Sequence, residues 1–174
     1  LAILARKPNI RVLAAPPPSE WGLSIQQIDG GSGLLVQTPD RFIATQADWK
    51  VVTERLPTVA EWRDLKLAWK VAAAVTSNTI VLVKGEQTVG IGAGQQNRRD
   101  AGLIAASKSH GRAEGGACAS DAFFPFPDGL EAAIDADCTA VIQPGGSIRD
   151  DEVIAAANKA AMAMVFTGER HFKH

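Results

Sequence analysis

The sequence has few of the residues that crosslink a chain or hold a transition metal. Its two cysteines, Cys118 and Cys138, are spaced for neither a disulfide framework nor a CxxC metal site. Only three histidines occur, and neither H-x-E nor C-x-x-C is present. These absences disfavour a zinc nucleoside deaminase and fit a reducing, cytoplasmic location.

Long apolar runs and strong charge are also missing. Without a run of 18 apolar residues or a signal peptide, we expect no membrane segment. The net charge of −1 gives no indication of a nucleic-acid or acidic-membrane partner. With 174 residues, 46% of them apolar, the chain is long enough for one domain with a real core, or for two small lobes.

The first residues read as the middle of a fold, because the chain starts at a leucine and a short apolar run soon follows at residues 10–14. We therefore expect a fragment rather than a complete gene product. The stretch Gly30–Gly33 predicts a turn that leads into a buried strand at residues 34–37. A phosphate-binding role for these glycines is disfavoured, because the Lys-Ser/Thr pair of a P-loop does not follow them.

From residue 56 onwards, helical and strand patterns alternate. Thr58 and Glu61 form a capping box, and Trp62, Leu65 and Trp69 follow at helical spacing. Such alternation is typical of an α/β domain. Further helices are predicted at residues 97–110, 130–136 and after 147–150, and further strands at 79–84, 88–92, 139–142 and 162–166.

One stretch, Ser120–Gly129, fits no regular element. Pro125 and Pro127 lack backbone donors and force their predecessors towards extended backbone, so a helix interior or a central strand is excluded. Its three phenylalanines and two aspartates suit a stiff loop that stacks on a flat heteroaromatic ligand and reads its polar edge. The alternative is a hydrophobic plug over the core, since phenylalanine is usually buried.

Several polar residues stand at predicted strand ends, where ligands of α/β sheets are commonly held. Asn78 precedes a strand, although an asparagine there is often only a turn residue. Arg98 lies in the first turn of a predicted helix, where it opposes the macrodipole, so we expect a functional reason for it. Together with Arg170 and the aromatic loop, these residues favour a small anionic heteroaromatic ligand. A nucleophilic triad is disfavoured, because Cys118 and Ser120 lack evident partners.

Five motifs occur in this order in one known family: Ser77–Ile80, Gly90–Arg98, Ser120–Gly129, Val141–Arg149 and Phe166–His174. As a set they resemble the C-terminal half of the transformylase domain in the AICAR transformylase/IMP cyclohydrolase family. The resemblance covers essentially the whole chain. It implies that residues 1–174 are the C-terminal part of that domain, without its upstream half and without the cyclohydrolase domain.

The resemblance implies a cytidine-deaminase-like, three-layer α/β fold without zinc. It also implies formyl transfer from 10-formyltetrahydrofolate to the 5-amino group of AICAR, giving FAICAR in purine (IMP) biosynthesis. The family works as a cytoplasmic homodimer with sites at the interface, so a second copy and the rest of the polypeptide are the expected partners. A bound potassium ion is a further expectation, with Asp121 in its site.

On the nucleotide side, the resemblance assigns Asn78 to a contact near the reacting amine and His174 to positioning the substrate or the general base. Phe123 is expected to stack on the imidazole, Arg170 to bind the phosphate, and Phe172 to contact the substrate. The folate side is expected to be lined by five residues: Arg98, Phe124, Pro125, Phe126 and Asp128.

The chain departs from the family pattern in one respect that matters for catalysis. The Lys-His pair that carries the family's acid–base chemistry belongs to an upstream motif that is absent from this sequence. We therefore expect this chain alone to be inactive. A non-catalytic nucleotide-binding or regulatory module that uses the same loop is the alternative.

Overall fold

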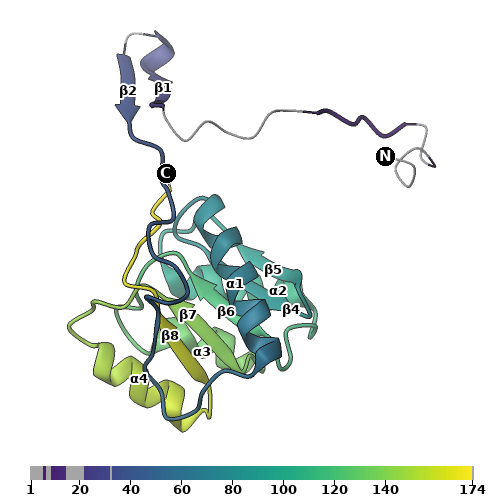
Figure 1. The fold of residues 1–174 in the computed structure, drawn as a ribbon, viewed down its shortest axis with the longest axis vertical. Coiled ribbons are helices and arrows are strands. Elements are labelled where there is room, and N and C mark those ends of the chain that lie inside the picture. Colours follow the sequence, from purple (N-terminus) through teal and green to yellow (C-terminus); the bar gives the residue numbers. More distant parts are fainter. Residues whose placement is uncertain (1–5, 7–8, 15–21, 32, 174) are drawn as a thin grey trace. The chain divides into compact units, whose positions relative to one another are not determined.

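The computed structural model describes residues 6, 9–14, 22–31 and 33–173. Two compact units divide the chain, Leu1–Pro39 and Asp40–His174. In the first unit, β1 (Ser24–Ile28) pairs with β2 (Gly33–Gln37) in an antiparallel hairpin, with a short 3-10 turn, η2 (Asp29–Gly31), between them (Figure 1).

The turn expected at Gly30–Gly33 is confirmed in its described part, because Gly30 and Gly31 have φ angles of 61° and 108°. Burial of the following strand was predicted wrongly. Leu34 is 66% exposed and Val36 is 49% exposed. Among the described residues, β2 pairs only with β1, so the hairpin leaves its apolar side chains uncovered.

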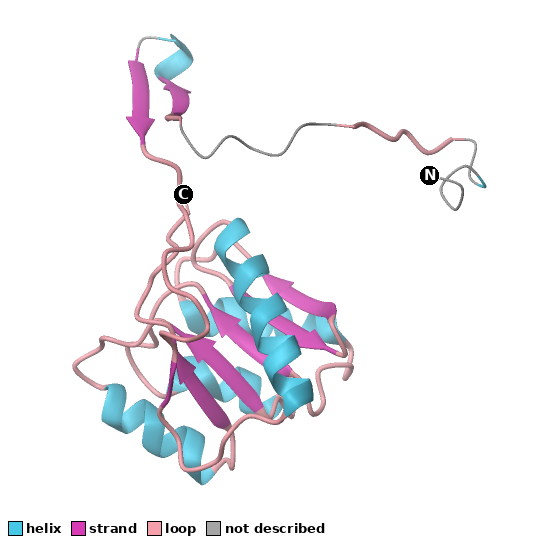
Figure 2. Ribbon diagram, in the orientation of Figure 1, coloured by secondary structure: helices cyan, strands magenta, loops and turns pink. Residues whose placement is uncertain are grey.

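The second unit contains a six-stranded mixed sheet in the order β3-β8-β7-β6-β4-β5 (Figure 2). The neighbouring strands β6, β7 and β8 run parallel, whereas β4 is antiparallel to both β5 and β6, and β3 is antiparallel to β8. The six strands are β3 (Lys50–Val51), β4 (Ile80–Lys84), β5 (Gln87–Gly92), β6 (Ala117–Ser120), β7 (Ala140–Gln143) and β8 (Ala163–Phe166).

Helices cover both faces of this sheet. The helix α1 (Val59–Ala74) packs on one face, and α2 (Arg98–Ser109), α3 (Asp128–Asp135) and α4 (Asp150–Lys159) pack on the other (Figure 1). The three-layer α/β architecture predicted from the sequence is thus confirmed. None of the described helices combines the length and the apolar character needed to cross a membrane.

The two cores follow from the two-residue period of the strands. In β4, Ile80 and Leu82 join the core beneath α2, α3 and α4, whereas Val81 and Val83 join the core beneath α1. Because both faces are covered, the strands read as continuous apolar runs rather than as alternating patterns. The predicted apolar face of α1 is confirmed at Leu65, which is fully buried.

Glycines in β5 allow α2 to lie directly on the strand. A Cβ added to Gly90 would come within 2.1 Å of the Ala105 carbonyl oxygen, and one added to Gly92 within 1.9 Å of the Ala101 carbonyl oxygen. No side chain can occupy these positions without moving the helix. The glycines of the Gly90–Gly94 stretch that lie in the strand therefore serve helix–strand packing.

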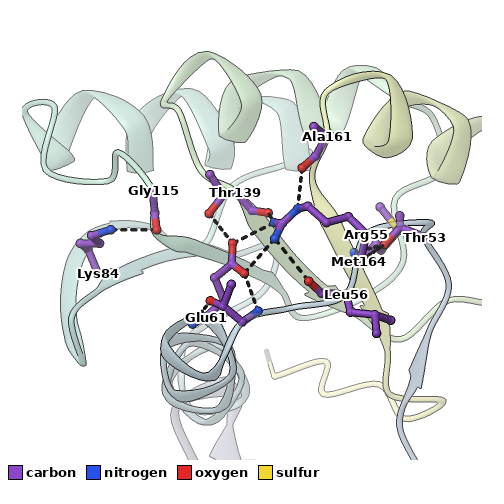
Figure 3. Close-up of polar contacts among 10 residues, drawn as sticks. Thr53, Arg55, Leu56, Glu61, Lys84, Gly115, Thr139, Ala161 and Met164 are labelled. Atoms are coloured by element: carbon purple, nitrogen blue, oxygen red, sulfur yellow. Dashed lines mark hydrogen bonds and ion pairs between the residues drawn. The ribbon is translucent and has the colours of Figure 1, made fainter.

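At the end of the sheet where β7 begins, a polar network ties α1 to the strands (Figure 3). The Arg55 guanidinium donates to both oxygens of Glu61, at 2.8 and 3.0 Å, and to the backbone carbonyls of Ala161 and Thr139. Glu61 also accepts from the Thr139 hydroxyl at 2.6 Å and from the backbone N–H of Thr58 at 2.7 Å. The predicted capping box is confirmed and is one part of this network.

These contacts set the charge state of Glu61. Burial acts to raise the pKa of the carboxyl, but the hydrogen bonds from Arg55, Thr139 and Thr58 outweigh burial and lower the pKa to about 2. Because this pKa lies below the ordinary value of 4.5, Glu61 stabilises the fold fully above pH 4.5 and loses this contribution as the pH falls towards 2.

We expect Glu61→Gln to lower the free energy of unfolding at pH 7 by about 2 kcal/mol, because the half-buried Arg55 loses its charged acceptor. The difference between wild type and Glu61→Gln should shrink steadily between about pH 5 and about pH 2. Urea unfolding followed by circular dichroism at several pH values measures both. The exposed Glu114→Gln variant is the control, and a pH-independent Glu61→Gln difference would contradict the interpretation.

Candidate functional site

The register of the sheet brings the predicted site residues to one end of it. The parallel strands β6, β7 and β8 all finish there, and β4 begins there because Ile80 lies opposite Ser120. The chain leaves β5 at the same end, because Ile80 also pairs with Gly92. Residues 75–79, 93–97, 121–127, 144–149 and 167–173 therefore converge on what we call the site end of the sheet.

A buried carboxylate, Asp121, lies at the centre of the site end. Asp121 is fully buried, and its oxygens accept hydrogen bonds from the Ser77 hydroxyl, the Thr79 backbone N–H and the Arg98 guanidinium. Its backbone carbonyl accepts from the His171 N–H at 3.1 Å. One residue thus connects the start of β4, the start of α2 and the C-terminal segment (residues 167–173).

Arg98 reaches this carboxylate from the first turn of α2, and its side chain is only 13% exposed. It donates to Asp121 Oδ1 at 3.2 Å and to the Ser120 hydroxyl at 3.1 Å. Burial lowers the pKa of the guanidinium, the Asp121 charge opposes that effect, and the positive charge of Arg170 lowers the pKa further. The unfavourable place of Arg98 in the helix is therefore explained by the carboxylate that it pairs with.

Asn78 is held at the start of β4 by the turn that follows β5. Its side-chain amide donates to the Gln95 carbonyl at 2.9 Å, and the backbones of Asn78 and Gln95 bond to each other in both directions at 3.2 Å. The preceding Ser77 donates its backbone N–H to the Lys173 carbonyl at 2.8 Å. Asn78 therefore sits on a rigid support between the β5 turn and the C-terminal segment.

The three phenylalanines of the aromatic loop (Ser120–Gly129) have different surroundings. Phe124 is fully buried in the core beneath α2 and α3, and its backbone N–H donates to the Gln143 side chain at 2.9 Å. Phe123 is half-buried, and Phe126 is 47% exposed. The plug interpretation is therefore confirmed for Phe124, whereas stacking on a ligand stays a prediction, for which Phe126 has the exposed surface.

Two exposed phenylalanine rings at the site end each pack against an arginine guanidinium. The Arg149 guanidinium lies 4.7 Å from the centroid of Phe126, and that of Arg170 lies 5.3 Å from the centroid of Phe172. Such cation–π pairs combine a flat apolar surface with positive charge. Pro125 and Asp128 are also exposed, with Asp128 as the first residue of α3 rather than a side-chain cap before it.

Two of the predicted roles concern His174 and a cation at Asp121. His174 lies outside the described residues. At Asp121, three donors already occupy the carboxylate oxygens, so a cation bound to the same oxygens would have to replace one of these donors. The potassium ion expected from the resemblance stays a prediction. Within the described ranges, no three His, Cys, Asp or Glu side chains are grouped so that they could hold a metal ion.

The cysteines offer no nucleophile to the site. Cys118 is buried within β6, and burial raises the pKa of its thiol well above the ordinary value. Burial likewise raises the pKa of Cys138 to about 12. A thiolate is therefore disfavoured at both positions at neutral pH.

Sequence reasoning missed Ser77, Ser120 and His171, each of which holds a predicted site residue or its segment in place. Ser77 could have been found from its position beside Asn78 in the Ser77–Ile80 motif. Nothing in the pattern near Ser120 indicates that it bonds Arg98 across a distance of 22 residues.

Comparison with known proteins gives a consistent result. Residues 1–108 match the family described as the AICARFT/IMPCHase bienzyme. The chain is 54% identical to the bifunctional purine biosynthesis protein PurH of Rhizobium meliloti over 186 aligned residues, which cover 99% of this chain and 34% of the relative. PurH of Cereibacter sphaeroides is 53% identical, with 99% and 35% covered. The chain thus spans about a third of the length of the curated relatives that it matches.

We expect Arg98→Met to destabilise the fold by about 3–5 kcal/mol, because it leaves the Asp121 carboxylate buried without its cation. Arg99→Met is the matched control, since Arg99 lies in the same helical turn but is exposed, and it should change stability by less than about 0.5 kcal/mol. Adding Asp121→Asn to Arg98→Met should recover part of the loss. Equal urea midpoints for Arg98→Met and Arg99→Met would rule out the pairing as a stabilising contact.

Proposed function

Because the chain belongs to the AICARFT/IMPCHase bienzyme family, we propose that its second unit forms part of a formyltransferase site in purine biosynthesis. The reaction is formyl transfer from 10-formyltetrahydrofolate to the 5-amino group of AICAR, giving FAICAR. The single observation that carries this proposal is the convergence at the site end of the sheet. Asn78, the Arg98–Asp121 pair, the aromatic loop and Arg170 meet there although they lie far apart in the sequence.

The nucleotide side of the proposed site combines an anion contact with a flat surface. Arg170 is exposed, and its planar guanidinium suits the oxygens of a phosphate. Arg170 and Arg98 lie near enough for the charge of one to affect the other, so an anion between or beside them relieves the repulsion. Phe123 is half-buried, which leaves part of its ring for stacking on the imidazole of AICAR.

Formyl transfer also places demands on the reacting amine. The amine nitrogen forms a bond to the formyl carbon, the bond from that carbon to folate N10 breaks, and a proton passes from the amine to N10. The amine is a weak nucleophile because its lone pair is delocalised into the imidazole. Asn78, fixed by the Gln95 carbonyl, is proposed to hold this amine in place.

On the folate side, the fit is uneven among the residues expected there. Three neighbouring residues are exposed to solvent: Phe126, whose ring packs against the Arg149 guanidinium, Pro125 and Asp128. Together they suit a ligand that has an apolar ring with a polar edge. Arg98 is largely enclosed, and the ring of Phe124 belongs to the core. We propose that Phe126 and Asp128 contact the folate, while Phe124 holds the loop from beneath.

Proton transfer is proposed to depend on groups beyond this chain. A positioned acid and base each contribute about 10²–10⁴-fold to such reactions. The resemblance places that pair upstream, so binding without turnover is the expectation for this chain.

The exposed apolar side chains of the β1–β2 hairpin support a covering partner, which we propose to be the rest of the polypeptide or the second copy of a homodimer.

We expect Arg170→Gln to weaken AICAR binding by about 10-fold or more, because a charge-assisted hydrogen bond to phosphate contributes about 1.5–3 kcal/mol. Phe123→Ala should weaken it by about 2–10-fold, the range for a lost ring stack of about 0.5–1.5 kcal/mol. Titration calorimetry of AICAR into the folded chain gives both values. Arg63→Gln, an exposed arginine near the start of α1, is the control, and unchanged affinity in both site variants would refute the assignment.

We expect Phe126→Ala and Asp128→Asn to weaken tetrahydrofolate binding severalfold while changing the affinity for AICAR by less than about twofold, because the two ligands use different parts of the loop. The exposed Glu131→Gln, on the same helix as Asp128, is the matched control. Anaerobic titration calorimetry with each ligand separates the two effects. Equal losses for both ligands would show that the loop does not divide its contacts in this way.

A further inference from the structure

The C-terminal segment alternates between exposed and buried side chains. Arg170 and Phe172 are exposed, whereas His171 between them is 1% exposed. His171 is thus buried while its two neighbours, the residues expected to contact the nucleotide, are exposed.

Two carboxylates face the buried imidazole. His171 Nδ1 lies 2.9 Å from Asp40 Oδ2, and Nε2 lies 3.9 Å from Glu169 Oε2. Glu169 is itself fixed, because its two oxygens accept from the backbone N–H groups of Ile43 and Ala44 at 2.6 and 3.1 Å. The imidazole and Glu169 together fasten the C-terminal segment to the stretch at residues 40–44.

Aromatic rings enclose the imidazole on its other sides. The Phe42 ring lies 4.5 Å away and the Trp69 ring of α1 lies 5.1 Å away, measured between centroids. Nε2 has no hydrogen-bond partner among the described residues. Burial of a polar ring costs free energy unless its nitrogens are hydrogen-bonded. The contact between Nδ1 and Asp40 is therefore the polar contact that offsets the burial of this ring.

We propose that His171 is a positioning residue, which fixes the C-terminal segment through Asp40, alongside the Glu169 contacts with residues 43 and 44, so that Arg170 and Phe172 face the nucleotide. This inference rests on the proposed function for the identity of the ligand, but not for the fastening itself. Other hydrogen bonds also hold the segment. His171 N–H donates to the Asp121 carbonyl and Ser77 N–H to the Lys173 carbonyl, the N–H groups of Thr167 and Gly168 donate to the Gln143 and Pro144 carbonyls, and the Lys173 ammonium donates to the Ala74 carbonyl. The imidazole contact thus links the segment to Asp40, and the His171 backbone N–H links it to the backbone carbonyl of Asp121.

Two substitutions at His171 separate hydrogen bonding from packing. His171→Asn keeps a donor near the position of Nδ1 but loses the ring, whereas His171→Leu keeps apolar volume but loses the donor. Asp40→Asn removes the carboxylate charge next to His171 Nδ1 without changing the sequence of the C-terminal segment. Asp151→Asn, an exposed aspartate on α4, is the control.

Amide hydrogen exchange of residues 169–173 in the folded chain measures the fastening without any ligand. We expect exchange at least about 10-fold faster in His171→Leu and Asp40→Asn than in wild type, and a smaller change in His171→Asn, because a donor rather than volume holds the segment. Unchanged exchange in both His171→Leu and Asp40→Asn overturns the proposal. Faster exchange in His171→Asn than in His171→Leu overturns it as well, because packing alone then accounts for the burial.

Titration calorimetry with AICAR then tests the consequence for the ligand. His171→Leu and Asp40→Asn should weaken AICAR binding by about 10-fold, His171→Asn should restore most of it, and Asp151→Asn should match wild type. In the complete enzyme, the same variants should raise KM for AICAR with little change in kcat. Equal affinities in all variants overturn the positioning role, whereas a wild-type chain that binds no AICAR counts against the proposed function and leaves the exchange result intact.

Discussion

The buried carboxylate of Asp121 is the contact on which the arrangement of the site end depends. A charge removed from water is tolerated only when donors surround it, and here two elements supply three donors: Ser77 and Thr79 at the start of β4, and Arg98 at the start of α2. The same residue binds the C-terminal segment through its backbone carbonyl. Elements that are distant in sequence are therefore positioned relative to one charge.

Around this centre, the aromatic loop has two functions at different depths. Phe124 lies in the core and ties the loop to Gln143 at the end of β7, so the exposed part has a rigid base. Phe126 and its arginine then present a flat, positively charged surface to solvent. Rigid support for exposed recognition groups reduces the entropy lost on binding. The combination suits a wall between two ligands, which is the arrangement proposed for AICAR and folate.

Much of this could be predicted from the sequence, and the misses have physical causes. The capping box at Thr58, the α2 boundaries and the alternation of strands and helices were recognisable because local hydrogen bonding and side-chain period determine them. Burial of β2 was predicted wrongly. Its apolar residues indicate that the strand packs against another surface, but they do not indicate whether that surface belongs to the same chain. The roles of Ser120 and His171 depend on contacts across 22 and 131 residues, which no local pattern encodes.

The glycines of β5 have a consequence for how this site can change. Side chains between a helix and a strand usually absorb small displacements, because they adopt new rotamers when either element moves. At Gly90 and Gly92 no side chain lies between the two elements, and the strand backbone packs directly on the helix backbone. A displacement of β5 towards α2 therefore has to move the helix backbone, and with it the arginine at its start.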